Sequence, residues 1–462
     1  MQPNPATHAP TSAPTAREGT LRDPALIATI QHLRQTDNLT NWWFILRTYA
    51  VLAVVIGGTL AASVAMNQAG WSAWWQVPIY AIAIVIVGAC QHQLSGLAHE
   101  GVHHTLFKHR KLNDLASDWF CMFPLFSSTH HYRLQHLAHH QFVNDPDRDP
   151  DISQLKSSGH WLGFPVSKRE FVRTILKQMW VPNLIRFMRI RAQYNATGTD
   201  QNPYLRKGVK PSKVAVRIGV LYILIMVISL TVLTIVGNPL LLAVIPGVLW
   251  LGMIAIFSRL PADKFHQSRV HPVISLRVMT LMRLTFITAL FASLAWITLL
   301  TGRWAALDFF LLWVVPIMTS FAFFMILRQL VQHGNGDRGW TTNTRTFLQN
   351  PLVRYAVFPM GQDYHLPHHM YASVPHFRLA KLHDALMQIP EYSDEATVVE
   401  GYFRPRYAGQ VNPTVLDIVT PEYAPHSGQV FVDDSVLEQD EVEDKEQILK
   451  VGEELRQTAT KE

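Results

Sequence analysis

Three short clusters of histidine hold the residues whose types and spacing could do chemistry in this chain. His99 and His103 are four residues apart, a spacing that places both on one face of a helix. The pattern His-x-x-His-His occurs twice, as HLAHH at residues 136–140 and as HLPHH at residues 365–369, with histidines at offsets of three and four. If these segments are helical, the three imidazoles of each can point toward one place. This is the geometry that metal ligands require.

The number of clustered histidines indicates which metal they would bind. Nine or ten convergent imidazoles exceed what one four-coordinate zinc ion can use. They suit two metals of the middle transition series, of which iron is the one that handles dioxygen. The candidate ligands are His99, His103, His104, His136, His139, His140, His333, His365, His368 and His369.

Carboxylates lie where they could orient these histidines by accepting the far N–H of a ligating ring, which fixes its tautomer. Glu100 stands inside the first cluster and Asp363 two residues before the third. A run of aspartates follows the second cluster, although Pro146 and Pro150 within it also fit a plain polar turn. The run consists of Asp145, Asp147, Asp149 and Asp151.

The composition points to a membrane protein as the scaffold. Of the 462 residues, 48% are hydrophobic and only 16% are charged, fewer charges than a globular surface usually carries. The net charge of +6 is better explained by loops that face anionic lipid than by nucleic acid, so no nucleic-acid partner is expected. The two cysteines cannot supply a disulfide framework or a four-thiolate metal site.

Six apolar runs approach the length that crosses a bilayer as helix, which predicts an all-α integral membrane protein. The second run contains Gln91, His92 and Gln93, and the fifth is short with Arg283 at its edge, so either could be a buried or interfacial helix. Six spans would form three hairpins. The runs are residues 48–66, 77–97, 218–236, 239–256, 284–300 and 309–327.

Charge placement predicts the orientation. Residues 98–213 contain 17 Lys and Arg, and residues 259–277 contain four, whereas the turns on the other side contain only Arg303. By the positive-inside rule both termini, the long loops and the histidine clusters are therefore expected in the cytoplasm. Residues 1–40 read as a disordered tail without a signal peptide, residues 41–390 as the membrane domain with its cytoplasmic cap, and residues 391–462 as a polar to acidic tail.

One segment between the second and third clusters mixes apolar and basic residues. Residues 170–191 fit either a helix that lies on the membrane surface or a packed amphipathic helix of the cap.

The whole pattern resembles the membrane fatty acid desaturase family, which carries a His-x-x-x-His box and two His-x-x-His-His boxes around membrane hairpins. The resemblance covers residues 41–390 and is carried by HEGVHHTLFKHRKLND, YRLQHLAHHQFVNDPDRDPD and YHLPHHMYASVPHFRLAKLH. It implies that the box histidines bind iron and that His333 is the family's isolated histidine, with His104 a weaker match. The chain departs from the family at Pro367, at Gln332, and in having six apolar spans where four are usual, so four to six spans are expected.

The resemblance also implies an activity and partners. Reduced di-iron in this family uses dioxygen to remove hydrogen from an unactivated methylene, so we expect two iron ions, O2 as co-substrate and desaturation of a lipid acyl chain. Electrons must come from outside, because the chain has no haem motif, cysteine cluster or nucleotide fingerprint. The expected donor is a ferredoxin, a rubredoxin or a small b-type cytochrome.

Two other functions remain open from the sequence. A hydroxylase or ketolase that acts on an alkyl chain or carotenoid shares the first hydrogen abstraction, so the histidine boxes do not separate it from a desaturase. The letters HEGVH at residues 99–103 also match the zinc-peptidase motif HExxH, with Glu100 as general base, although this leaves the other clusters unexplained.

Overall fold

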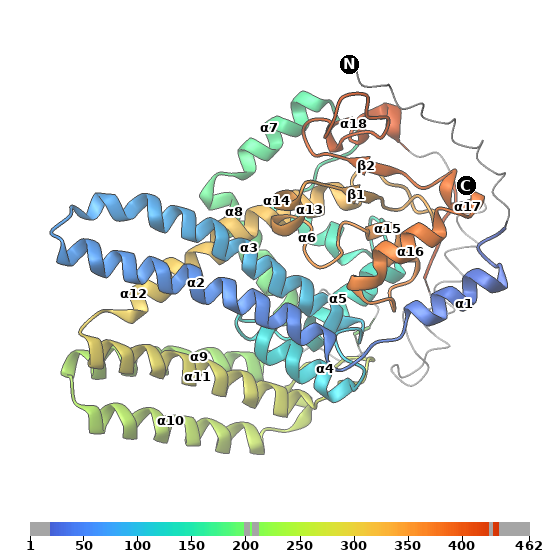
Figure 1. Ribbon diagram of the computed structural model, residues 1–462. Coiled ribbons are helices and arrows are strands. Elements are labelled where there is room, and N and C mark those ends of the chain that lie inside the picture. The colour runs from blue at the N-terminus through green and yellow to red at the C-terminus, as the bar shows by residue number, and fades with distance from the viewer. Residues whose placement is uncertain (1–18, 198–203, 206–211, 425–427, 434–462) are drawn as a thin grey trace, which may run out of the picture.

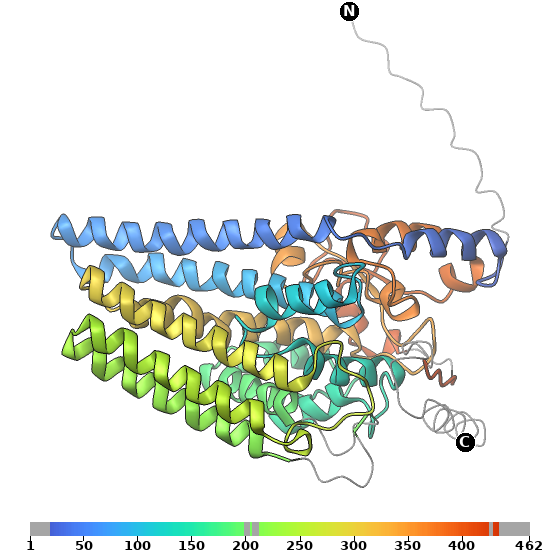
Figure 2. The ribbon, with the colours of Figure 1, turned by 90° about the horizontal axis from the view of Figure 1, so that it is seen from below.

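The computed structural model describes residues 19–197, 204–205, 212–424 and 428–433, and most of them are helical. Six long apolar helical segments lie side by side at one end of the molecule, and the shorter elements form a cap at the other end (Figures 1 and 2). The predicted six spans are confirmed by length and composition. They are α2 (Thr40–Gln68), α3 (Gln76–Val102, after a 3-10 turn at Ala73–Trp75), α9 (Val214–Val236), α10 (Pro239–Arg259), α11 (Leu276–Thr301) and the segment Ala305–Gln332.

The sixth span is not a regular α-helix along its whole length. It begins as α12 (Ala305–Phe309), continues through two π-helical segments, η4 (Phe310–Val314) and η5 (Ile317–Phe321), and ends as α13 (Ala322–Gln332). Helix α3 packs closely on this span, since a Cβ at Gly88 would come within 2.1 Å of Ser320 Oγ. The absence of a side chain at Gly88 therefore allows α3 to lie this close to η5.

The polar residues that made the second predicted span impure all find partners inside the protein. Gln91 Nε2 donates to the Trp313 carbonyl at 2.8 Å, and His92 Nδ1 lies 2.7 Å from the Ala356 carbonyl. Gln93 Nε2 donates to the Tyr355 carbonyl at 2.5 Å. Because each of these side chains forms a hydrogen bond with a backbone carbonyl, α3 can run unbroken from the far turn into the cap.

Helices α9, α10 and α11 form a bundle with its own apolar core, which includes Met226, Met253, Phe257 and Leu284. The turn between α9 and α10 suits its residues, because Gly237 adopts a positive φ of 70° and Asn238 caps the Leu241 N–H. Helix α11 begins at Leu276, eight residues before the predicted fifth run. Arg283 therefore lies within the helix and not at its edge.

The cap consists of short helices and one pair of parallel strands around the end of α13. Strand β1 (Thr346–Leu348) pairs with β2 (Val398–Glu400), and the apolar core beneath them contains Phe347, Val399 and Val331. The helices are α4 (Arg110–Ser117), α5 (Thr129–Gln141), α6 (Pro150–Ser158), α7 (Lys168–Gln178), α8 (Val181–Thr197), α14 (Pro351–Ala356), α15 (His365–Met370), α16 (Leu379–Leu386), α17 (Pro390–Ser393) and α18 (Val415–Ile418). A π-helical segment, η2 (Asp118–Met122), continues α4.

Both predicted tails are partly ordered parts of the cap. Helix α1 (Pro24–Leu33) lies within the expected tail of residues 1–40, but it buries Leu26, Ile30 and Leu33 against α16. Beyond residue 390, Val415 and Ile418 are fully buried in the core of the cap. The apolar residues in these two segments are few and lie among polar residues, so the sequence did not predict that they are buried. Residues 1–18 and 434–462, which include most of the acidic run, lie outside the described part.

The amphipathic segment 170–191 is divided between α7 and α8, which pack in the cap. Phe171, Ile175 and Phe187 are buried in its core, as the packed-helix interpretation requires. Leu176 and Trp180 are exposed on the other face, at 63% and 66% of their surface.

Candidate metal centre

The three histidines of α5 point in two directions. His136 and His140 are one helical turn apart, and their Nε2 atoms lie 3.0 Å from each other. His139 faces a different set of rings, and its Nε2 lies 3.1 Å from His333 Nε2. A step of about 100° per residue separates neighbouring side chains on a helix, so adjacent histidines cannot serve one point. The expectation that all three converge is corrected accordingly.

Helix α15 divides its histidines in the same way. His365 and His369 lie with their Nε2 atoms 3.2 Å apart, whereas His368 Nε2 lies 3.1 Å from His140 Nε2. The departure at Pro367 costs this helix nothing, because Pro367 is in the first turn, where an N–H has no intrahelical acceptor. Strand β1 and the residue before it hold α15 in place: Phe347 N donates to the Asp363 carbonyl and Leu366 N to the Arg345 carbonyl.

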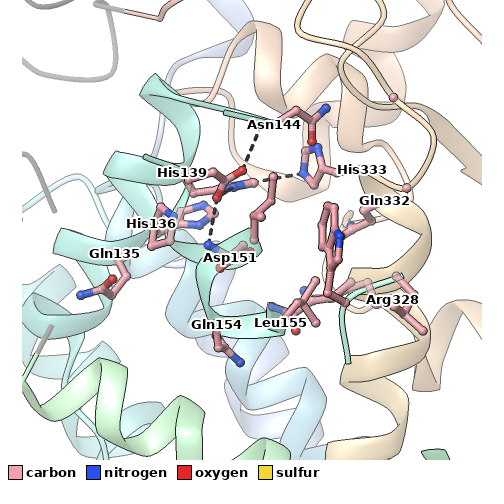
Figure 3. Close-up of a pocket in the computed structure, with 18 of the residues that line it drawn as sticks. Gln135, His136, His139, Asn144, Asp151, Gln154, Leu155, Arg328, Gln332 and His333 are labelled. Atoms are coloured by element: carbon pink, nitrogen blue, oxygen red, sulfur yellow. Dashed lines mark hydrogen bonds and ion pairs between the residues drawn. The ribbon is translucent and has the colours of Figure 1, made fainter. Parts of the chain in front are cut away.

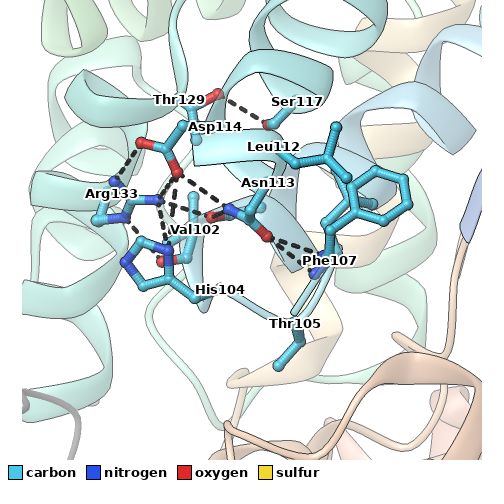
Figure 4. Close-up of polar contacts among 12 residues, drawn as sticks. Val102, His104, Thr105, Phe107, Leu112, Asn113, Asp114, Ser117, Thr129 and Arg133 are labelled. Carbon is cyan, nitrogen blue, oxygen red and sulfur yellow. Dashed lines mark hydrogen bonds and ion pairs between the residues drawn. The ribbon is translucent and has the colours of Figure 1, made fainter. Parts of the chain in front are cut away.

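His99 and His103 face the same group of rings at the end of α3, as their spacing predicted. The ring of His99 lies 4.4 Å from that of His136 and 4.5 Å from that of His368, measured between centroids. His104 does not join either group. The chain turns out of the helix at this residue, with a φ of 57°, and His104 Nδ1 lies 3.7 Å from Asp114 Oδ1 (Figure 4).

The nine remaining candidates form two groups, and in each the possible ligand atoms lie within 4.8 Å of one another. The groups are neighbours, since the rings of His140 and His369 stack at 4.1 Å between centroids. The five-histidine group is His99, His103, His136, His140 and His368, and the four-histidine group is His139, His333, His365 and His369.

The spacing of the ring nitrogens fits a shared metal ion. Between His333 and His365 the Nε2 atoms are 2.9 Å apart, and four further Nε2 pairs within the groups lie between 3.0 and 3.2 Å apart. Two nitrogens bound at about 2.1 Å with a right angle between them are about 3.0 Å apart. Both nitrogens of His99 and the Nε2 of His103 are also buried without a hydrogen-bond partner among the described residues. A metal ion bound by the five-histidine group would take up one nitrogen of each of these two rings.

Burial keeps most of these rings neutral. It lowers the pKa of His136, His140 and His368 well below the usual value, and the neighbouring histidines lower it further. The same holds for His333, His365 and His369. A neutral imidazole keeps a free lone pair, so the donor set of both groups suits a transition metal such as iron.

Asp149 is the carboxylate that makes a hydrogen-bonded pair with a ring of either group. Its Oδ1 lies 2.9 Å from His139 Nδ1, and both side chains are buried. Burial alone would lower the pKa of His139, but the charges of Asp149 and Asp151 raise it to about 9. Asp149 therefore fixes Nδ1 as the protonated atom, which leaves Nε2 to face the centre.

The other predicted carboxylates have different partners. Glu100 lies 3.5 Å from His99 Nδ1, but its Oε2 accepts hydrogen bonds from Thr105 Oγ1 and the His376 N–H. Asp145 pairs with Arg338 and Arg148, and Asp363 pairs with Arg354. Of the remaining run, Asp147 donates its N–H to Asp145, and Asp151 donates its N–H to Asp149.

Arg133 joins the end of α3 to α5 and so holds two of the three helices of the five-histidine group against each other. Its guanidinium donates to the carbonyls of Gly101 and Val102, the last residues of α3, at 2.8 and 2.9 Å. It also makes a bidentate pair with Asp114 of α4, at 2.7 and 3.0 Å (Figure 4). Arg133 lies three residues before His136 on α5.

A cavity of about 340 Å³ lies beside the four- and five-histidine groups (Figure 3). His136, His139 and His333 line it, and in the figure the rings of His139 and His333 point toward each other. Tyr132 and Arg191 form another part of its wall. A small substrate segment can therefore reach the histidines from within the protein.

Sequence reasoning missed several residues that shape the site. The Asn343 carbonyl lies 3.1 Å from His333 Nδ1 and plays for that ring the part that Asp149 plays for His139. No side-chain pattern can reveal a backbone acceptor. Tyr132 and Arg191 are nearly 60 positions apart in the sequence, and no local motif marks them as wall residues of one cavity.

Comparison with known proteins agrees with this geometry. A family model for fatty acid desaturases matches residues 72–266 and 258–399. The chain is 23% identical to the dihydrorhizobitoxine desaturase of Bradyrhizobium elkanii over 384 residues, which cover 82% of this chain and 84% of the relative. It is 31% identical over 111 residues to a Delta(5) fatty acid desaturase of Caenorhabditis elegans and 29% identical over 96 residues to a Delta(8)-fatty-acid desaturase of Euglena gracilis. Those two alignments cover 24% and 21% of this chain and 23% of each relative.

The matched region contains five of the six spans and both histidine groups, and it extends over more than half of the chain. The protein is therefore an oxidoreductase of the desaturase type that belongs to the fatty acid desaturase family.

Proposed function

We propose that this protein is a membrane di-iron oxygenase that desaturates a lipid acyl chain with O2 and electrons from an external donor. The observation that carries the proposal is the pair of adjacent, all-nitrogen histidine groups beside an internal cavity. Iron suits such a donor set and handles dioxygen, whereas one zinc ion would use only four of the nine rings.

The five-histidine group would hold one iron and the four-histidine group the other. When bound, the two irons supply the reduction of dioxygen and the removal of hydrogen from an unactivated methylene. The chain's own residues position the reaction. Asp149 and the Asn343 carbonyl hold the rings of His139 and His333.

A lipid substrate is supported by the surroundings of the site. A further cavity of about 250 Å³ lies among α9, α11 and the sixth span, with an almost wholly apolar wall that includes Phe291, Phe309 and Val314. The relative aligned over most of the chain is named for dihydrorhizobitoxine, and those aligned over shorter segments are named for fatty acids. We therefore assign the substrate class from the cavities and not from the names.

The donor and the orientation complete the proposal. Both cysteines are buried, and the sequence holds only these two, so a ferredoxin, rubredoxin or small b-type cytochrome would supply the electrons. The excess of Lys and Arg in the segments of the cap supports a cytoplasmic site, and a basic face would steer an acidic donor.

The peptidase alternative does not fit Glu100. A general base must reach a metal-bound water, but one oxygen of this carboxylate accepts hydrogen bonds from Thr105 and His376, and the other faces His99. His99 and His103 also share their group with three more imidazoles.

Metal analysis of purified protein tests the proposal. We expect about two irons per chain, one for each histidine group. The adjacent residues His368 and His369 belong to different groups, so His368→Ala and His369→Ala should each lose about one iron and all turnover. His104→Ala is the matched control and should keep both irons.

Product analysis by mass spectrometry decides between the two oxygenase functions. Alkenes from a supplied acyl lipid support desaturation, whereas alcohols or ketones would assign the hydroxylase or ketolase function instead. One zinc per chain without iron would contradict the proposal as a whole.

A further inference from the structure

A second large cavity lies where the cap meets the bundle of α9, α10 and α11. Its volume is about 670 Å³, and its walls come from the first turns of α9 and α11, the end of α8 and the start of α5. Val216, Val220 and Ile287 make part of the wall apolar. The polar part contains four basic side chains, Lys213, Arg283, His131 and His266.

Arg283 is unusual because it is a half-buried cation inside a membrane span. Among the described residues it makes no ion pair or hydrogen bond, and Asp118 is the described carboxylate whose charge reaches it. Asp118 is itself occupied, since its Oδ1 accepts the N–H and the hydroxyl of Thr129 at 2.7 and 2.8 Å. A charged residue within a span is costly and marks a binding site more often than a structural contact.

The two histidines add neutral hydrogen-bonding groups to this surface, because burial lowers the pKa of both. Their rings lie 5.3 Å apart between centroids, and Ser128 Oγ contacts His131 Nδ1 at 2.6 Å, which leaves His131 Nε2 without a described partner. Lys213 is exposed at the start of α9. Lys213 and Arg283 thus bring positive charge to a cavity whose wall is partly apolar.

This cavity adjoins a smaller one, which in turn adjoins the cavity beside the metal centre. Phe126, Ala192 and Arg283 line both the large cavity and a cavity of about 150 Å³. The small cavity in turn shares Tyr132, Arg191 and Asn195 with the cavity beside the histidines. Tyr132 stands at this second boundary, with its ring 5.5 Å from that of His136.

The small cavity has walls built for a ligand and not only for packing. Met122 comes from the π-helical segment η2, and Ile317, Met318 and Phe321 come from η5. A π-helical turn disturbs the regular hydrogen bonding of a helix and is found mostly at functional sites. Here two such turns, about 200 residues apart in the sequence, line the same passage.

We propose that the large cavity binds the anionic head group of the substrate, a carboxylate or phosphate, on Arg283 with Lys213, His131 and His266, and that the apolar tail passes through the small cavity toward the histidines. This inference rests on the proposed function, because it names the end of the substrate that stays away from the metal centre. In this arrangement, the positions of the large and small cavities set the distance between the head group and the metal centre. The substrate class is an anionic amphiphile with a single chain in the passage.

Binding of defined probes to purified, iron-loaded protein tests the inference. The probes are stearate, stearyl alcohol and a stearoyl lysophosphatidate, which share one chain length and differ in the head group. Wild-type protein should bind at least one of the anionic probes about tenfold more tightly than the alcohol. The tighter of the two identifies the head group as carboxylate or phosphate.

Three variants locate the site. Arg283→Gln should remove most of the preference for the anionic probe and leave binding of the alcohol unchanged. Lys213→Glu, at an exposed position where the change should not disturb folding, should lower the affinity for the anionic probe about threefold or more. Arg217→Gln is the matched control, because Arg217 is an exposed cation in the same turns of α9 that does not line the cavity. Equal binding of alcohol and anions by the wild type, or unchanged anion binding in both Arg283→Gln and Lys213→Glu, would overturn the inference.

The outcome is separable from that of the proposed function. Two irons and alkene products together with an Arg283→Gln variant that binds stearate normally would reject only the head-group site. Binding of the anion through Arg283 in a chain without iron would reject only the oxygenase.

Discussion

At the scale of single residues, each His-x-x-His-His box contributes ligands to both histidine groups. In both His-x-x-His-His boxes the first and last histidines serve one group, and the middle one serves the other. The sequence showed which residues could be ligands, because offsets of three and four are visible in it. It could not show how they are shared, since that depends on how α5 and α15 face each other in space.

Asp149→Asn tests the role of a single carboxylate. The variant loses the charge that holds His139 Nδ1 protonated, so the affinity of the four-histidine group for iron should fall about 10- to 100-fold, while the five-histidine group keeps its ion. Iron analysis after dialysis against a weak chelator should then give about one iron per chain. Asp145→Asn is the control, because Asp145 pairs with arginines and touches no described histidine of the centre. Equal iron loss in both variants would refute the role of Asp149.

At the scale of elements, the long helices could be predicted and the cap could not. A run of about 20 apolar residues has few alternatives to a membrane span, and all six predicted runs lie within long helical segments of the structure. The ends were less certain, because α3 continues past the predicted run to Val102, and Gln91 and Gln93 inside the run donate to the carbonyls of Trp313 and Tyr355. The π-helical turns and the pairing of β1 with β2 depend on tertiary packing and left no periodic signal.

Gly88→Ala tests the contact between α3 and the π-helical turn η5. The added Cβ would come within 2.1 Å of Ser320 Oγ and 2.7 Å of the backbone nitrogen of Phe321, so we expect a loss of about 1–3 kcal/mol in stability. Thermal unfolding in detergent measures it. Gly58→Ala on α2 should unfold at or slightly above the wild-type temperature, because no atom lies within 4 Å of its added Cβ. The interpretation fails if both variants lose the same stability.

At the scale of the whole molecule, the spans and the cap form two regions (Figure 2). The histidine groups come from α5 and α15 of the cap and from the ends of α3 and α13. All six spans end near the cap on one side, and the turn between α2 and α3 lies on the other. A single measurement of orientation therefore shows on which side of the membrane the cap and its histidine groups lie.

Cysteine labelling in intact cells provides that measurement. The two natural cysteines are buried, so a membrane-impermeant maleimide should react only with an introduced one. Ser72→Cys in the turn between α2 and α3 should be labelled from outside, and Lys381→Cys on α16, also exposed, only after the cells are opened. The reverse pattern would place the cap outside the cytoplasm.

The distribution of the two histidine groups along the chain determines when the centre can form. Each group draws on α5 and on α15, which are more than 200 residues apart, with four of the six spans between them. Under the proposed ligand set, a nascent chain that has not yet reached α15 has only His139 and His333 for the second iron. Metal loading must therefore follow membrane insertion. The bound ion then links α5, in the first half of the chain, to α15, in the second half.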